Sequence, residues 1–236
     1  MEEHIRIDKR FCGPPGNGHG GYVSGVVAAK IGGGGIGGAE VTLRSPVPLD
    51  RALSVERPED GRVTVHDGAT LIAEATDAEL DIDIPEAPTL AQAEDAARSY
   101  FGLGQHPYPD CFACGDGRAP GSGLAIMSGP VDGSDVVAAP WLPHQSLAAT
   151  DGTVGPEYLW AALDCPSAWA LLRGDHVPVL LGRITARVKE GLKTGASCIV
   201  YAWPIATDGR KLYGGSAIVS ESGELWGASR ATWFKV

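Results

Sequence analysis

The chain has 236 residues, 44% of them hydrophobic and 20% charged, an ordinary composition for a globular protein with a sizeable core. The formal net charge of −10 argues against a nucleic-acid or anionic-membrane surface. No apolar run approaches the roughly 18 residues that favour a membrane span. The charged first residues lack the apolar core of a secretion signal, and the odd count of five cysteines is typical of reduced thiols, so we expect a cytoplasmic protein.

The first part of the chain predicts one strand, one helix and then four strands. Residues 4–11 alternate apolar and polar side chains, as a half-buried strand does. The segment 21–31 is apolar on most faces and about three turns long, which indicates a buried helix, and the glycines of 31–38 end it. Runs separated by turn residues then predict strands at 39–49, 51–58, 61–68 and 69–80.

After a connector, the same order of elements returns. Residues 81–110 are rich in proline and glycine and hold one short predicted helix, at 89–100. Strands are then predicted at 123–130 and 135–142, a buried helix at 153–174, and four further strands at 178–192, 196–208, 211–222 and 223–236.

The repetition is also visible in the letters. "VTLRSPVPL" at 41–49 matches "ITARVKEGL" at 184–192 in an apolar–Thr–x–Arg start and in the final leucine, and each follows the helix of its own half. These matches predict an internal duplication, with domains at 1–80 and 111–236 joined by the connector 81–110.

One long helix wrapped by an antiparallel sheet, present twice in one chain, resembles the double form of the hotdog fold. The segment "CFACGDGRAPGSGLAI" (111–126) also resembles the opening of many small acyl-CoA thioesterase domains. The resemblance implies an α+β tandem hotdog in which each half is an antiparallel sheet around one long central helix. It also implies that the halves pair edge to edge, with their two helices side by side.

The glycine-rich stretch "GNGHGGYVSG" (16–25) immediately precedes and begins the first predicted helix. In hotdog thioesterases of the phenylacetate-pathway type, which it resembles, His-Gly-Gly starts the helix and an aspartate follows nine residues after the histidine. This chain has His19, Gly20 and Gly21, but Ala28 stands where the acid is expected. The first half therefore keeps the loop whose N–H groups hold a developing negative charge and lacks the acid.

The second half shows the opposite loss. Asp164 stands nine residues after Gly155, but Pro156 replaces the first glycine of the motif and has no N–H to donate. In the family that the chain resembles, each site takes its loop from one subunit and its acid from the other. The resemblance thus implies one complete site, built from the loop of the first half and Asp164 of the second.

Such a site implies a thioester hydrolase that acts on acyl-CoA or on an acyl-carrier protein. Asp164 would activate water or attack directly, the Gly20 N–H would hold the oxyanion, and His19 would orient the loop or the acyl carbonyl. Two alternatives stay open: an acyl-CoA-binding protein that has lost activity, and an enoyl-CoA hydratase or dehydratase in which His19 and Asp164 share proton transfer. No cofactor is required, and the fold permits a homodimer of double hotdogs.

Several residues allow more than one interpretation. Asp164 also suits the N-cap of a helical segment that restarts at Pro166, and Glu157 is a reserve acid in the first turn of the helix. The aromatic helix residues either fill the core or line an acyl tunnel. Candidates for substrate contact are Asn17, Gly21, Tyr22, Glu157 and Trp160, and candidates for the coenzyme A phosphates are Arg44, Arg183, Arg187 and Lys189.

The remaining motifs carry weaker signals. "GPPGNGHGG" lacks the Lys-Ser/Thr of a phosphate-binding loop. Cys111 and Cys114 have the spacing of metal ligands, but no second Cys/His pair stands nearby at a matching interval, and the thioredoxin context of a redox pair is missing. From the sequence we therefore expect no metal site.

Overall fold

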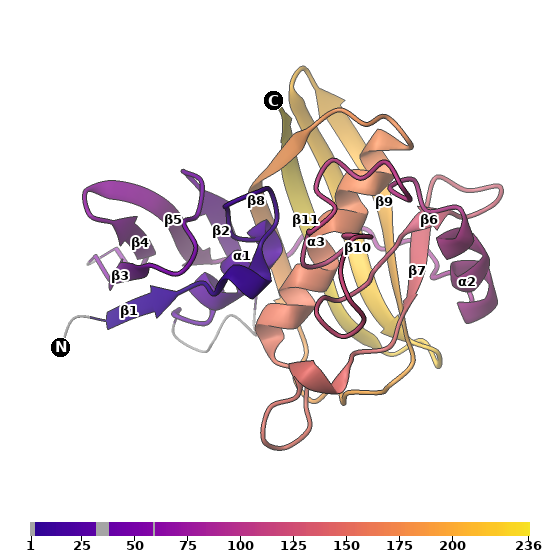
Figure 1. The fold of residues 1–236 in the computed structure, drawn as a ribbon, viewed down its shortest axis with the longest axis horizontal. Helices are drawn as coiled ribbons and strands as arrows, with labels where there is room; N and C mark the ends of the chain where they lie inside the picture. Colours follow the sequence, from indigo (N-terminus) through magenta and orange to yellow (C-terminus); the bar gives the residue numbers. More distant parts are fainter. Residues whose placement is uncertain (1–2, 32–37, 59) are drawn as a thin grey trace.

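The computed structural model describes residues 3–31, 38–58 and 60–236, which form an α+β fold around one antiparallel sheet (Figure 1). Its strands lie in the order β1-β3-β4-β5-β2-β8-β11-β10-β9-β7-β6. They are β1 (Glu3–Arg6), β2 (Ala39–Leu43), β3 (Ala52–Glu56), β4 (Val63–Asp67), β5 (Thr70–Asp77), β6 (Gly129–Pro130), β7 (Val137–Trp141), β8 (Val179–Val188), β9 (Cys198–Asp208), β10 (Lys211–Ser220) and β11 (Leu225–Lys235).

The sheet is joined at its middle by the antiparallel pair β2 and β8. In this pair Val41 lies directly opposite Ile184, and Ala39 lies opposite Ala186. Val41 and Ile184 begin the two sequence segments that resemble each other, so the matching segments are neighbours across the centre of the sheet. Strands from residues 3–77 lie on one side of this junction, and strands from residues 129–235 lie on the other.

Two central helices, α1 (Gly20–Ala28) and α3 (Pro156–Leu172), pack against each other on one face of the sheet (Figure 1). They cross at two glycines one turn apart. A Cβ at Gly21 would stand 2.5 Å from the Asp164 Cβ, and one at Gly25 would stand 2.6 Å from the Glu157 Cα. Only glycine permits this approach, which brings the start of α1 to the middle of α3.

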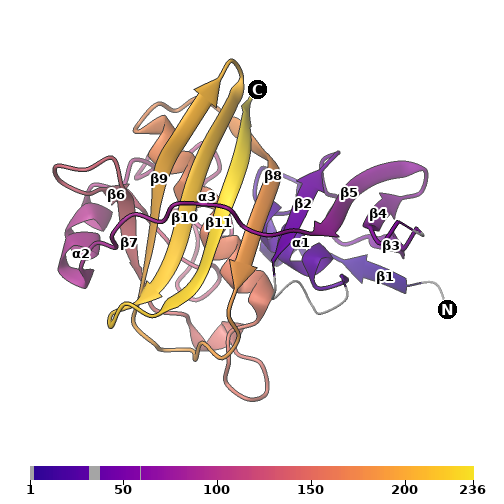
Figure 2. The same cartoon turned by 180° about the vertical axis from the view of Figure 1, so that it is seen from behind.

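The opposite face of the sheet is crossed by the connector, as Figure 2 shows. There the Tyr201 hydroxyl on β9 donates a hydrogen bond to the Pro85 carbonyl. The connector then forms α2 (Leu90–Arg98), which begins at a capping box between Thr89 and Gln92 and packs against β7. No helix in the described part of the chain is long and apolar enough to cross a membrane.

Three predicted strands are much shorter than expected, and one of them, predicted at 39–49, ends at Leu43. The strand predicted at 4–11 ends at Arg6, because the Asp8 side chain accepts the Arg10 N–H and starts a 3-10 turn. In the region predicted as a strand at 123–130, only Gly129–Pro130 pairs in the sheet, while the N–H groups of Leu124 and Ile126 donate to the 112–113 backbone. Most of the glycine run that was predicted to end the first helix, 32–37, lies outside the described residues.

Candidate functional site

A cavity of about 500 Å³ lies where the start of α1 meets the middle of α3. Four of the predicted catalytic and substrate-contact residues line it: Asn17, His19 and Gly20 from the loop before α1 and its first turn, and Asp164 from α3. The structure therefore brings together the loop of the first half and the acid of the second half. Much of the remaining wall is apolar and comes from β2, β8, β11 and the segments beside them: Leu43, Val47, Val179, Leu180, Leu181, Trp233, Phe234 and Val236.

The carboxylate of Asp164 is buried and its two oxygens differ. Oδ2 accepts a hydrogen bond of 2.6 Å from the Gly21 N–H and lies 3.4 Å from His19 Nε2. Oδ1 has no hydrogen-bond partner in the described part of the protein. One oxygen is thus held at the positive end of α1, and the other is a buried acceptor without a hydrogen-bond partner among the described residues.

The alternative role for Asp164, as the N-cap of a helical segment restarting at Pro166, is wrong. α3 is continuous from Pro156 to Leu172 and contains Pro166 in its interior. The Asp164 carboxylate bonds to α1 instead, while its main-chain carbonyl accepts a hydrogen bond from the Ser167 hydroxyl. This side chain stabilises the contact between the two helices and caps neither segment of α3.

Burial raises the pKa of Asp164 from 3.8 to about 6, because an ionised carboxylate loses hydration inside the protein. The nearby His19 and the Gly21 N–H act in the opposite direction and limit the rise. The group is therefore mainly ionised near neutral pH and has a pKa suited to taking up a proton.

His19 is buried and forms the N-cap of α1, since its Nδ1 accepts the Tyr22 N–H at 3.2 Å. In the neutral ring this bond leaves the proton on Nε2. Nε2 faces Cys165 Sγ at 3.2 Å and Asp164 Oδ2 at 3.4 Å. Burial lowers the pKa of His19, but negative charge at Cys111 and Asp164 outweighs it, and the net shift is upward.

The two glycines after His19 have different positions. Gly21 gives its N–H to Asp164 and packs against α3. Gly20 is the first residue of α1, so its N–H has no acceptor within the helix, and Gly20 lines the cavity. A Cβ at Gly20 would stand 3.4 Å from Asp164 Oδ2, which places this backbone next to the carboxylate.

Other predicted contact residues lie away from the cavity. Tyr22 stacks on Phe11 with ring centroids 3.9 Å apart, and Trp160 is buried against Gly25. Glu157 places its carboxylate beside Gly155 at the start of α3. Sequence reasoning also missed the apolar wall from β8 and β11, although the alternating apolar residues of 178–192 and 223–236 carried that signal.

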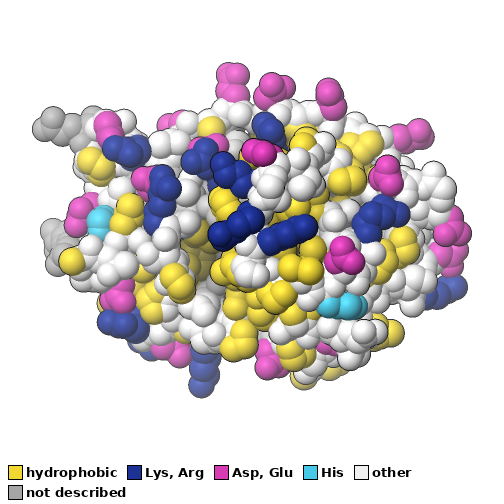
Figure 3. Space-filling view, turned by 90° about the horizontal axis from the view of Figure 1, so that it is seen from above, with side chains coloured by type: hydrophobic (Ala, Val, Ile, Leu, Met, Phe, Trp, Pro, Cys, Tyr) yellow, Lys and Arg dark blue, Asp and Glu magenta, His cyan; other side chains and the backbone are white. Residues whose placement is uncertain are grey.

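Of the four basic candidates, only Arg44 lines the cavity, where its guanidinium pairs with Glu74. Arg183 pairs with Glu40 on β2, and Lys189 pairs with Glu224. Viewed from the end of the molecule that carries the C-terminus, Lys and Arg side chains gather beside apolar ones (Figure 3). Arg187 is exposed on β8.

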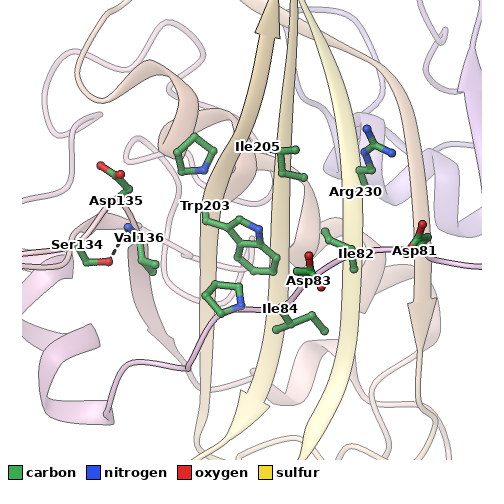
Figure 4. Close-up of a pocket in the computed structure, with 12 residues that line it drawn as sticks. Asp81, Ile82, Asp83, Ile84, Ser134, Asp135, Val136, Trp203, Ile205 and Arg230 are labelled. Carbon is green, nitrogen blue, oxygen red and sulfur yellow. Dashed lines mark hydrogen bonds between the residues drawn. The ribbon is translucent and has the colours of Figure 1, made fainter.

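A second hollow, of about 690 Å³, lies between the connector and the outer face of the sheet (Figure 4). Trp203 and Ile205 of β9 line it together with Ile82 and Ile84 of the connector. It contains none of the predicted site residues. Its carboxylates belong to the connector and to the 134–136 turn. The hollow is the gap between the connector and the sheet that it covers, and no histidine lies beside a carboxylate in its lining, as His19 lies beside Asp164 in the first cavity.

Comparisons with known proteins identify the fold. No family model and no curated protein matches the sequence. Among solved structures, a candidate thioesterase from Novosphingobium aromaticivorans is 16% identical, with a TM-score of 0.63 over 100% of this chain and 95% of that one. A TesB protein from Mycobacterium avium subspecies paratuberculosis is 14% identical, with a TM-score of 0.60 over 99% and 96%.

A protein of unknown function with a hot dog fold, from Alicyclobacillus acidocaldarius, is 10% identical, with a TM-score of 0.63 over 100% of this chain and 93% of that one. The chain therefore has the α+β hotdog fold of these thioesterase-like proteins over its whole length. At these identities the likeness concerns the fold, and the chemistry has to be argued from the site.

Proposed function

We propose that this chain is a double hotdog that hydrolyses thioesters of coenzyme A or of an acyl-carrier protein at a single site between its two units. The units are residues 1–80 and 111–236, joined by the connector 81–110. The direct pairing of Val41 with Ile184 supports the duplication, since it relates the two matching segments by an approximate twofold axis. The contact that carries the functional proposal is the 2.6 Å hydrogen bond from the Gly21 N–H to Asp164 Oδ2.

The reaction follows from the different positions of the two carboxylate oxygens. Gly21 holds Oδ2, and Oδ1 removes a proton from a water molecule that attacks the thioester carbonyl carbon. The carbonyl oxygen gains negative charge as it becomes tetrahedral, and the Gly20 N–H at the positive end of α1 stabilises it. When the oxyanion collapses, the C–S bond breaks and the departing thiolate takes up the proton held by Asp164.

The symmetry-related position has neither component. Ala28 stands where the acid of the first unit is expected, and it is buried. Pro156 occupies the first helical position of α3, so that position has no N–H to offer an oxyanion. The proposal therefore places one active site, and not two, in each chain.

The apolar wall favours an acyl group as the buried part of the substrate. Leu181, Trp233 and Phe234 line the cavity together with Asp164. Arg44 also lines the cavity, and its guanidinium is paired with Glu74. An acyl chain would lie against the apolar strands, and a charged coenzyme or carrier group would extend toward solvent.

Thiol release from short, long and aromatic acyl-CoAs tests the proposal on the wild-type protein. Turnover of at least one substrate, with free thiol and carboxylate in equal amounts, supports it. Tight binding of acyl-CoA without turnover would replace the hydrolase with a binding protein. Hydration of an enoyl-CoA without thiol release would replace it with a hydratase.

A further inference from the structure

Three buried thiols meet beside the proposed site. Cys111 Sγ lies 3.6 Å from Cys165 Sγ and 3.6 Å from Cys114 Sγ, and all three cysteines are free. Cys165 directly follows Asp164 on α3, whereas the other two belong to the loop after the connector. The fold therefore supplies, from a distant part of the chain, the third ligand that the Cys-x-x-Cys pair lacked in sequence.

The loop that carries Cys111 and Cys114 is a tight turn. The Gly115 N–H donates to the Cys111 carbonyl at 3.0 Å, and a Cβ at Gly115 would stand 2.3 Å from the Pro109 carbonyl oxygen. Only glycine fits there, and the turn directs both thiols toward α3. This "CFACG" arrangement matches the Cys-x-x-Cys spacing of structural zinc sites.

Two of the three sulfur separations suit one tetrahedral ion. Thiolates bound to a single Zn²⁺ at about 2.3 Å with tetrahedral angles stand about 3.8 Å apart. The Cys111–Cys165 and Cys111–Cys114 separations, both 3.6 Å, need only a small adjustment to reach that value, and a rotation of the Cys114 side chain would bring its sulfur closer to that of Cys165. A ring nitrogen of His19 also lies within 4.8 Å of both Cys111 Sγ and Cys165 Sγ.

Two histidines donate to this cluster. His106 Nδ1 accepts the Tyr108 N–H at 2.8 Å, as His19 Nδ1 accepts the Tyr22 N–H, so each neutral ring carries its proton on Nε2. His106 Nε2 lies 3.1 Å from Cys114 Sγ, and His19 Nε2 lies 3.2 Å from Cys165 Sγ. Two N–H groups directed at sulfur are the outer-shell donors that a thiolate site requires.

We propose that Cys111, Cys114 and Cys165 bind one Zn²⁺ as thiolates, with His19 and His106 as N–H donors to the sulfurs. The fourth ligand position belongs on the cavity side, since Cys111 and Cys165 line the cavity. The site fastens the 108–117 loop to α3 directly beside Asp164. Three thiolates leave a net negative charge on the site, so the ion acts as a structural link and the hydrolysis proposed above does not pass through it.

The test is metal binding by the full chain, measured without reference to activity. The reduced protein, stripped of metal with a chelator, is titrated under anaerobic conditions with Co²⁺ and then with Zn²⁺. We expect one equivalent of Co²⁺ to give thiolate-to-cobalt charge-transfer absorption that Zn²⁺ abolishes. X-ray absorption at the zinc edge should show three sulfur atoms at about 2.3 Å and one lighter ligand.

Variants locate the ion. Cys165→Ser should abolish the cobalt absorption, whereas Cys198→Ser, a buried cysteine on β9 outside the cluster, should leave it unchanged. His106→Gln should weaken zinc binding by about 10–100-fold and leave the three sulfur ligands in place. The cobalt titration of the wild-type protein is a test by itself, so a variant that fails to fold does not leave the proposal untested.

The proposal is overturned if the reduced wild type binds less than one equivalent of either ion. It is also overturned if Cys165→Ser keeps the cobalt absorption, if the zinc edge shows two sulfurs and two nitrogens, or if the thiols form a disulfide in protein isolated under reducing conditions. None of these results bears on thiol release, so this proposal and the proposed hydrolase can fail separately.

Discussion

Replacing Gly21 with alanine should force the two central helices apart. The new Cβ would stand 2.5 Å from the Asp164 Cβ and 2.6 Å from the Trp160 carbonyl oxygen. Carbon atoms pack at about 3.5–4.0 Å, so the helices would have to separate by about 1 Å. Overpacking of this kind costs about 1–3 kcal/mol, and the better helix propensity of alanine returns up to about 1 kcal/mol. We expect a net loss of about 1–2 kcal/mol, which lowers Tm by roughly 2–8 °C in a chain of this size.

The assay is denaturant and thermal unfolding of Gly21→Ala beside the neighbouring variant Gly20→Ala. A Cβ at Gly20 would meet the Leu181 side chain, with Cδ2 at 2.9 Å and Cβ at 3.1 Å, and it would touch no backbone atom as closely as the one at Gly21 does. Gly20→Ala should therefore cost about 1 kcal/mol less than Gly21→Ala. Equal stability of the two variants would refute the helix crossing described above.

Three further predictions concern the site and its support. Gly20→Pro removes the proposed oxyanion donor and should lower kcat by about 10²–10³-fold relative to Gly20→Ala. The alanine variant is the control because it adds a similar Cβ and keeps the N–H. Equal rates in the two variants would contradict the role of Gly20 as oxyanion donor. Gly25→Ala should destabilise the protein, because its Cβ would stand 2.6 Å from the Glu157 Cα. The folded fraction of this variant should keep its kcat, and a selective loss of kcat would place Gly25 in the site. Chelation of the proposed zinc should lower the Tm of the wild type but not of Cys165→Ser. If the Tm of the wild type is the same with and without the chelator, the ion does not stabilise the fold.

Much of the fold could be predicted because local patterns agree with it. The helix predicted at 153–174 appears as Pro156–Leu172, and the helix predicted at 89–100 appears as Leu90–Arg98 behind a capping box. The two matching segments lie opposite each other at Val41 and Ile184. Pairing the loop of one half with the acid of the other also predicted the meeting of His19 and Asp164, which are 3.4 Å apart between Nε2 and Oδ2.

The rotation of the central helices could not be predicted from pattern. Both are apolar on most faces, so periodicity does not say which side chains face the cavity. The sequence therefore left open whether Tyr22 and Trp160 fill the core or line the cavity, and in the structure both pack in the core, where Gly21 and Gly25 fix the crossing.

The cluster of three thiols could not be predicted from the sequence for a related reason. Cys165 is remote in sequence from Cys111 and Cys114, and only the placement of α3 brings its sulfur to 3.6 Å from Cys111 Sγ. The absence of a second Cys/His pair at a matching interval was the basis for expecting no metal. The sequence signal that points to Cys165 is its position directly after Asp164.

Comparison of Asp164→Asn with Glu157→Gln on the preferred acyl-CoA shows whether Asp164 is the acid of the proposed composite site. Both changes turn a carboxylate of α3 into an amide, but Glu157 lies outside the cavity. We predict that kcat/KM for thiol release falls by about 10²–10⁴-fold in Asp164→Asn and stays close to the wild-type value in Glu157→Gln, with both proteins folded. Wild-type turnover in Asp164→Asn, or its loss in Glu157→Gln, would contradict the assignment.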